Sequence, residues 1–303
     1  MEWTAVFDKL VAEKLPELRV LYNEPMAKHT TFRIGGPAAR MACPETISQL
    51  TALLELWHNE RYLILGNGSN MLVSDEGISY PVINTTGLRR IELLEGNILR
   101  AECGASLARA AVLAQKNGLA GMTCLHGIPG TVGGAVRMNA GAYGGEISRI
   151  VKSVLAWLPE RGVVSLTGDE LAFSYRHSLF CERDGAVLSA DLQLSQGDPR
   201  ELLREMEELA VRRREKQPLE YPSAGSFFKR PTGHFAGVLI EQCGLKGLTV
   251  GGMQISPKHA GFVVNIGGGT CAQTLKLMEL VRQKVLTETG VWLEPEVTVT
   301  GDK

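Results

Sequence analysis

The sequence predicts an α+β protein with more than one domain. Segments with helical periodicity are interspersed with short runs of β-branched and aliphatic residues, and several of these runs follow one another directly, as strands of an antiparallel sheet do. The chain has 303 residues, of which 44% are hydrophobic, so it can bury more than one core of ordinary domain size.

The N-terminal part favours helices and short strands in alternation. A leading helix is expected over residues 3–15 and a loop over residues 28–37. A further helix begins after Ser106, a favourable capping residue, and ends at Gly118. The remaining expected elements here are a helix over 45–59 and strands over 40–43, 62–65, 81–84, 90–94 and 98–102.

A change of pattern near residue 197 predicts a domain boundary. Residues 151–194 are rich in strand formers, whereas Asp198 and Pro199 are typical of a helix start, and that helix is expected to reach about Gln217. The predicted domains are residues 1–196, with subdomains of about 1–85 and 86–196, and residues 197–303. The later expected elements are a strand over 260–265, a helix over 271–289 closed by Gly290, and a final strand over 293–300.

Charge and composition disfavour several classes of partner. The 32 Lys and Arg residues balance 33 Asp and Glu residues, so the net charge of -1 provides no basic field for nucleic acid. The six cysteines and six histidines lack the spacing of a zinc site. The chain starts without a secretory pattern, and no stretch approaches the roughly 18 unbroken apolar residues of a membrane span. A cytoplasmic enzyme without a metal, a membrane contact or an obligatory protein partner is expected.

A small-residue loop follows the strand expected over 62–65. It consists of Gly66, Asn67, Gly68, Ser69 and Asn70, and such residues let backbone N–H groups converge on a phosphate. The next residue is a methionine where the Rossmann fingerprint has its third glycine, and no helical periodicity follows, so a nicotinamide Rossmann site is disfavoured. Taken alone, the loop fits a tight turn as well as a phosphate site.

A second glycine-rich stretch covers residues 127–144. So much glycine is costly in backbone entropy unless something must approach the backbone closely. Two such stretches favour a long cofactor with two phosphates. The sequence contains no G-x-x-x-x-G-K-[ST] motif, so a P-loop triphosphate site is excluded.

Six motifs in a fixed order cover nearly the whole chain. They are the HTTFRIGG stretch at 29–36, the GNGSN loop at 66–70, the GIPGTVGG run at 127–134, Tyr175-Arg176, the PSAGSFFK stretch at 222–229 and the EPEV stretch at 294–297. Together they resemble the UDP-N-acetylenolpyruvoylglucosamine reductases of the shorter, second type. The resemblance implies a two-subdomain FAD-binding fold of the vanillyl-alcohol-oxidase (PCMH) type, followed by a C-terminal α+β substrate domain.

The resemblance also implies FAD as cofactor and NADPH as co-substrate. The FAD diphosphate would lie on the two glycine segments, and Arg213 would be a further flavin-side contact. Its neighbours Arg212 and Arg214 are expected to be solvated. The implied cofactor-binding residues are Gly66, Asn67, Gly68, Ser69, Asn70, Gly127, Ile128, Pro129, Gly130, Thr131, Gly133, Gly134 and Arg213.

By the same resemblance, the catalytic residues are Arg176, Ser226 and Glu296. Reducing an enolpyruvyl ether needs a hydride at the terminal methylene and a proton at the adjacent carbon, while charge develops on the substrate carboxylate. Arg176 would pair with that carboxylate through its planar fork. Glu296 would hydrogen-bond the enol-like intermediate from a desolvated position, and Ser226 would donate the proton once activated by neighbouring charge.

Several of these roles have ordinary structural explanations. Outside the motif context, Arg176 fits a surface ion pair, and Ser226 fits a turn serine. Glu294 has the same parity along the expected strand as Glu296, and only the Glu-Val pair of the family favours Glu296. The resemblance makes Tyr175, Lys216 and Lys229 the substrate-binding residues, and either lysine could activate the serine. Arg230, His126 and His259 are left without an assigned role.

The implied activity is NADPH-dependent, FAD-mediated reduction of UDP-N-acetylglucosamine enolpyruvate to UDP-N-acetylmuramate for peptidoglycan synthesis. Two alternatives remain open. One is an FAD-dependent oxidase of small alcohols or sugars with the same fold, which the joint presence of Arg176, Ser226 and Glu296 disfavours. The other is a flavin- or nucleotide-sugar-binding protein without turnover, which the competent residue types at all three positions disfavour.

Overall fold

The computed structural model describes residues 2–302 and divides them into two compact units. Unit 1 consists of the chain up to Tyr22, Arg40–Asn67 and Tyr80–Val211. Unit 2 consists of Asn23–Ala39, Gly68–Ser79 and the chain from Arg212 onward. Two short N-terminal segments therefore fold with the C-terminal unit. The change of unit at Arg212 falls inside a helix, whereas the sequence-based boundary at residue 197 lies just before it.

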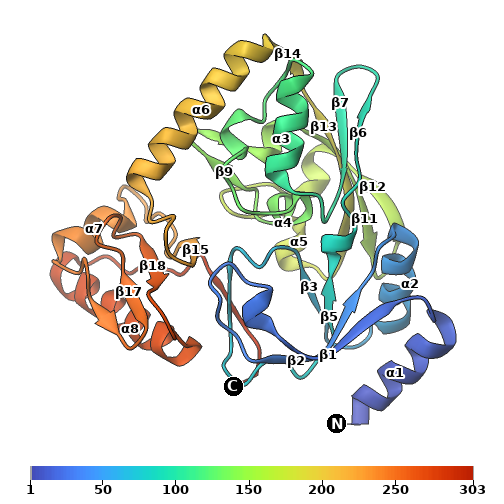
Figure 1. The fold of residues 1–303 in the computed structure, drawn as a ribbon, viewed down its shortest axis with the longest axis horizontal. Helices are drawn as coiled ribbons and strands as arrows, with labels where there is room; N and C mark the ends of the chain where they lie inside the picture. The colour runs from blue at the N-terminus through green and yellow to red at the C-terminus, as the bar shows by residue number, and fades with distance from the viewer. Residues whose placement is uncertain (1, 303) are drawn as a thin grey trace. The chain divides into compact units, whose positions relative to one another are not determined.

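Unit 1 is built on a five-stranded antiparallel sheet in the order β12-β11-β13-β7-β6. These strands are β6 (Ile91–Leu94), β7 (Ile98–Glu102), β11 (Val151–Leu158), β12 (Gly162–Leu166) and β13 (Ala186–Gln193). The helix α3 (Leu107–Lys116) packs against β7, and α4 (Val132–Arg137) packs against β7 and β13. Figure 1 shows both helices in green beside the sheet. All five strands lie where the sequence predicts strands.

A second sheet has the order β1-β2-β5-β3, in which β5 pairs in parallel with both β2 and β3. Its strands are β1 (Arg19–Pro25), β2 (Pro37–Cys43), β3 (Leu63–Leu65) and β5 (Val82–Asn84). The helix α2 (Ile47–Trp57) buries Leu50, Leu53 and Leu54 in the core of unit 1, and the side chain of Thr46 caps its first turn. The other elements that lie wholly in this unit are α1 (Glu2–Lys14), α5 (Leu179–Glu182), β8 (Leu119–Ala120), β9 (Gly141–Ala142), β10 (Gly145–Glu146) and β14 (Ser195–Gln196).

Unit 2 contains a four-stranded sheet in the order β15-β18-β17-β16 and its own hydrophobic core. The elements are β15 (Ser223–Ser226), β16 (Thr249–Val250), β17 (Met253–Ile255), β18 (Phe262–Asn265), α7 (Ala236–Gln242) and α8 (Cys271–Thr289). Figure 1 shows them in orange and red. Leu277 and Val281 of α8 pack in this core with Phe227.

The two early segments of unit 2 are tied to its late residues. The strand β4 (Met71–Val73) pairs in parallel with β19 (Thr298–Thr300), the last strand of the chain. The Asp75 carboxylate accepts hydrogen bonds from the backbone N–H groups of Cys271 (2.7 Å) and Ala272 (2.9 Å) at the start of α8. Phe32 joins the core beside Phe227.

The long helices begin and end where the sequence predicts. The helix α6 (Pro199–Lys216) starts after Asp198, whose carboxylate accepts from the N–H groups of Arg200 and Glu201. The helix α8 begins with a capping box and ends at Gly290, which has φ +71°.

The expected final strand over 293–300 is wrong in its first half. Only Thr298–Thr300 form a strand, β19. Residues 294–296 instead lie beside residues 227–229, and the chain then changes partner to β4. Pro295 has no N–H to donate to a continuous ladder, which is a physical reason for the break.

Within residues 2–302, no helix is both long enough and apolar enough to span a membrane. In the same residues, no group of three or more His, Cys, Asp or Glu side chains is arranged to hold a metal ion.

Candidate functional site

The two glycine-rich stretches meet inside unit 1. The side-chain amide of Asn67 donates to the carbonyl oxygen of Pro129 at 3.3 Å. A Cβ atom at Gly66 would lie 2.5 Å from the Thr131 hydroxyl oxygen, so only glycine fits there. The structure thus brings together the first two residues of the GNGSN loop and the middle of the GIPGTVGG run.

Both stretches contain backbone N–H donors that no other described residue accepts from. Among the hydrogen bonds within residues 2–302, none involves the amide N–H of Asn67, Gly68, Ser69 or Asn70. The N–H groups of Gly130 and Thr131 are also unused by other described residues. Backbone N–H groups on small residues are what an anionic phosphate group requires, so each stretch, taken by itself, is suited to contact a phosphate.

Gly133 and Gly134 differ in the reason for being glycine. A Cβ atom at Gly133 would lie 2.8 Å from the Cβ of Cys103, so packing alone requires glycine there. At the exposed Gly134, the nearest atom to an added Cβ is the Thr131 hydroxyl oxygen at 3.4 Å, an ordinary contact. Burial raises the pKa of the Cys103 thiol to about 12, which disfavours the reactive thiolate form.

Arg176 lies in a tight turn of unit 1 between Ser174 and His177. The backbone groups of Ser174 and His177 bond to each other in both directions, and Arg176 has φ +55°, a conformation that L-residues adopt only at a cost. Its guanidinium donates to the carbonyl oxygens of Asn139 (3.5 Å) and Gly141 (3.1 Å). Tyr175 is 55% exposed, and its ring centroid lies 5.3 Å from the guanidinium carbon.

Ser226 and Glu296 lie on neighbouring segments of unit 2. The N–H of Glu296 donates to the carbonyl oxygen of Phe227 at 2.9 Å, and the N–H of Lys229 donates to that of Glu294 at 2.8 Å. Ser226 is exposed at the end of β15, directly after Gly225 with φ +78°. Glu296 is half-buried.

The two candidate glutamates have different surroundings. The Glu294 side chain is 65% exposed and forms an ion pair with Lys229, whose Nζ lies 3.4 Å from its Oε2. The carbonyl oxygen of Glu296 accepts from the Asn70 side chain at 3.1 Å, and the N–H of Thr298 donates to the Asn70 carbonyl at 3.0 Å. Asn70 therefore anchors the Glu296 segment as well as closing the GNGSN loop.

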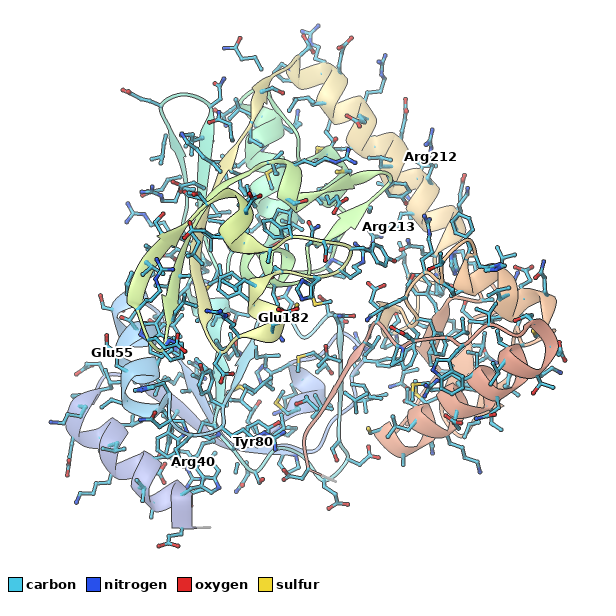
Figure 2. The ribbon with its side chains drawn as sticks, turned by 180° about the vertical axis from the view of Figure 1, so that it is seen from behind. Arg40, Glu55, Tyr80, Glu182, Arg212 and Arg213 are labelled. Atoms are coloured by element: carbon cyan, nitrogen blue, oxygen red, sulfur yellow. The ribbon has the colours of Figure 1, made fainter. Side chains whose placement is uncertain are left out.

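The last turns of α6 carry Arg213 and Lys216. Arg213 is half-buried, and its Nε donates to the Gln217 side chain at 2.9 Å. Arg212, Arg214 and Lys216 are exposed. Figure 2 shows Arg212 and Arg213 leaving the helix at different points around it, so one side chain is solvated while its neighbour is held.

The candidate residues fall into one group in each unit. Unit 1 holds Tyr175, Arg176, the 127–134 run, Gly66 and Asn67, and unit 2 holds the others. Sequence reasoning gave no role to Asn139, which lies two residues after the last residue of α4. An asparagine at a helix end is a common sign of a left-handed backbone, and Asn139 has φ +41°.

His259 has a structural role in unit 2. Its Nδ1 accepts a hydrogen bond from the N–H of Gly261 at 3.1 Å, and its ring packs edge-on against Phe262. Burial lowers the pKa of His259, with a smaller opposing effect from its own backbone.

Comparisons with known proteins point to one enzyme family. Residues 217–300 match the family model described as the C-terminal domain of UDP-N-acetylenolpyruvoylglucosamine reductase, and residues 38–167 match an FAD binding domain. The chain is 45% identical to the UDP-N-acetylenolpyruvoylglucosamine reductase of Caldanaerobacter subterraneus subsp. tengcongensis and 46% identical to that of Agathobacter rectalis, over 98% of both chains in each case. The crystal structure of the reductase from Thermus caldophilus superposes with a TM-score of 0.79 at 35% identity, covering 93% of this chain and 98% of that chain.

Proposed function

The chain belongs to the UDP-N-acetylenolpyruvoylglucosamine reductase family, and from this premise we propose how its residues carry out the reaction. Family membership makes the protein a flavin-dependent oxidoreductase with FAD as its cofactor, as the sequence predicts. The reaction reduces UDP-N-acetylglucosamine enolpyruvate to UDP-N-acetylmuramate, a step of peptidoglycan synthesis, with NADPH as co-substrate. The oxidase and the non-catalytic alternatives are not favoured.

The proposed flavin region is residues 1–196, and the proposed substrate domain is residues 197–303. The positions of the two matched family models, 38–167 and 217–300, support this division. The proposed diphosphate contacts are the two glycine stretches, because the N–H groups of residues 67–70, Gly130 and Thr131 donate to no other described residue and Gly134 is open. Bound FAD would supply the hydride to the substrate after being reduced by NADPH. Arg213, oriented by Gln217, would add a positive charge on the flavin side.

Arg176 is the proposed partner of the substrate carboxylate. A guanidinium is planar, permanently charged and able to pair with both oxygens of a carboxylate. Two carbonyl groups of unit 1 already fix its orientation, so it would meet the developing charge without reorganising. The strained φ of Arg176 supports this role, because a left-handed arginine persists only where its surroundings impose it.

Ser226 is the proposed proton donor, and Glu296 is the proposed hydrogen-bond partner of the enol-like intermediate. One observation carries this assignment: the backbone of Glu296 bonds to Phe227, the residue after Ser226. The exposed Ser226 hydroxyl can reach a substrate, while the half-buried Glu296 carboxyl is partly removed from water. Tyr175, Lys216 and Lys229 are proposed substrate contacts, and all three are exposed.

The partners of this enzyme family are small-molecule substrates, and we place the protein in the cytoplasm. All six cysteines are free, which fits a reducing compartment. No role of nucleic acid, membrane or a second protein enters the proposed reaction.

The activity is tested by an anaerobic titration of the flavin-loaded protein, followed by flavin absorbance. NADPH should bleach the flavin, and UDP-N-acetylglucosamine enolpyruvate should restore it without oxygen. Recovery that requires oxygen would favour the oxidase. A protein without flavin, or a flavin that NADPH does not reduce, would favour a binding protein.

A further inference from the structure

We propose that Asn139 is a positioning residue that fixes Arg176 relative to the glycine run, an inference that rests on the proposed function of Arg176. Among the described residues, Asn139 forms no hydrogen bond with residues 66–70 or 127–134, so its effect on the reaction is transmitted through Arg176. Asn139, Arg176 and the residues that bond to them all belong to unit 1.

Asn139 stands at the junction between the glycine run and the turn of Arg176. The run continues into α4, which Thr131 caps by accepting from the N–H of Gly134, and Asn139 follows the C-cap residue Met138. The residue is only 2% exposed and has φ +41°. Asparagine tolerates this left-handed backbone better than most residues, and glycine tolerates it best.

The buried Asn139 amide is fully engaged. Its Nδ2 donates to the Ser174 carbonyl oxygen (2.9 Å) and to the Glu146 carboxylate (2.5 Å), and its Oδ1 accepts from the N–H of Ser148 (3.2 Å). An amide offers two donors and one acceptor group, and each has a partner here. The side chain therefore ties the Ser174 end of the turn to the 146–148 segment.

The backbone of Asn139 contacts Arg176 itself. Its carbonyl oxygen accepts from the Arg176 guanidinium, and that of Gly141, two residues on, accepts a second bond. The same stretch is held again just before Asn139, where the Arg137 carbonyl accepts from the Ser178 hydroxyl at 2.7 Å. Removing the Asn139 amide leaves the Ser174 carbonyl and the Glu146 carboxylate without their shared donor, so the turn of Arg176 would loosen.

The proposal is tested with Asn139→Gly and Asn139→Asp in the flavin-loaded protein. Glycine keeps the left-handed backbone and removes only the amide, whereas aspartate keeps the shape but places an oxygen between two acceptors. Stopped-flow measurement separates flavin reduction by NADPH from flavin reoxidation by UDP-N-acetylglucosamine enolpyruvate. Reoxidation should slow about 10- to 100-fold, since a displacement on the order of 1 Å costs up to about 100-fold, while reduction by NADPH stays within about twofold.

Asn97→Gly is the matched control, because Asn97 also has a left-handed backbone in unit 1 but sits in the β6–β7 turn. It should leave both half-reactions unchanged. If Asn139→Gly does not fold, Glu146→Ala removes one partner of the amide and should slow reoxidation severalfold. Equal slowing of both half-reactions by the Asn139 variants would show a merely structural role and overturn the proposal.

A double-variant comparison separates this inference from the proposed function. If Asn139 acts through Arg176, the Asn139→Gly change should cause no further loss in an Arg176→Ala background. A full additional loss there would overturn the inference alone. If Arg176→Ala itself leaves reoxidation unchanged, the proposed role of Arg176 is wrong, and the inference fails with it.

Discussion

The backbone N–H of Glu296 donates to the carbonyl oxygen of Phe227 at 2.9 Å, which joins the two motifs that carry the proposed proton chemistry. The PSAGSFFK and EPEV stretches are far apart in the sequence, yet they form neighbouring segments of unit 2. The Asn70 side-chain amide adds a third segment by donating to the Glu296 carbonyl oxygen. Three separate motifs of the family thus meet in one small hydrogen-bond network.

This network predicts different effects for the two candidate glutamates. Glu296→Gln should slow flavin reoxidation by the enolpyruvyl substrate roughly 100-fold, because an amide is a far weaker acid than a carboxyl group and so a weaker hydrogen-bond donor to the enol-like intermediate. Glu294→Gln is the matched control, and it should stay within about twofold, because its exposed ion pair with Lys229 is worth little. Stopped-flow measurement of the reoxidation rates tests the assignment. A larger slowing by Glu294→Gln than by Glu296→Gln would contradict it.

Ser226→Ala should leave flavin reduction by NADPH intact and slow reoxidation by a factor of about 100 to 10,000, the usual range for loss of a general acid. Ser223→Ala in the same strand is the control, since Ser223 contributes its backbone carbonyl to the bond from Thr31. Single-turnover rates for the two variants test the role. Full activity of Ser226→Ala would revive the alternative of a turn serine.

Alanine substitutions at the two adjacent glycines of α4 distinguish a role in folding from a role in cofactor binding. Gly134→Ala should leave the apoprotein as stable as before or raise its stability by about 0.5–1 kcal/mol, because alanine is the better helix former and the site is open. The same Cβ should weaken FAD binding by obstructing close approach. Gly133→Ala should instead lower apoprotein stability, because its Cβ would clash with Cys103.

Thermal unfolding of the apoproteins and FAD titration measure these two effects independently. Wild-type FAD affinity in Gly134→Ala would remove this glycine from the proposed diphosphate contacts.

Local signals in the sequence predicted the regular elements well. The helix over 271–289 agrees with α8 at both ends because Thr270 and Gly290 are strong start and stop residues. Missed elements include β1 and α7, and the final strand was overextended through Pro295. A Pro in a strand is tolerated at an edge, so the local pattern alone did not exclude it.

Long-range pairing was less accessible to sequence reasoning. That residues 68–79 fold with the C-terminal unit follows from the parallel pairing of β4 with β19 and from the Asp75 bonds to α8. Neither contact leaves a periodic pattern in the sequence. Motif order predicts the candidate site residues, whereas no motif points to Asn139, whose three side-chain hydrogen bonds are a property of the folded structure.

The Asp75 cap predicts a stability effect within unit 2. Asp75→Ala should lower the free energy of unfolding by about 1–2 kcal/mol, because two N–H groups at the start of α8 lose their acceptor and the helix dipole loses a negative charge. Glu76→Ala is the control, since the exposed Glu76 lies next to Asp75 and makes no side-chain bond to α8 among the described residues. Urea unfolding measures both, and equal stability of the two variants would contradict the cap.

His259 predicts a pH dependence of unfolding. Its Nδ1 accepts from the Gly261 N–H, so protonation of that nitrogen breaks the bond, and burial lowers the pKa of His259 in the folded protein. The charge of Lys246 acts in the same direction, and that of Glu241 opposes it. Because the folded pKa lies below the unfolded value of about 6.5, the stabilisation is complete above about pH 6.5 and is lost as the pH falls through the folded pKa.

Urea midpoints of the wild type and His259→Gln, measured from pH 8 to pH 5, isolate this contribution. Glutamine does not titrate, so the stability advantage of the wild type should shrink as the pH falls below about 6.5. Replacing the exposed His234 with glutamine controls for the loss of a histidine as such. A constant difference between wild type and His259→Gln over this range would mean that His259 keeps the same protonation behaviour when the protein unfolds.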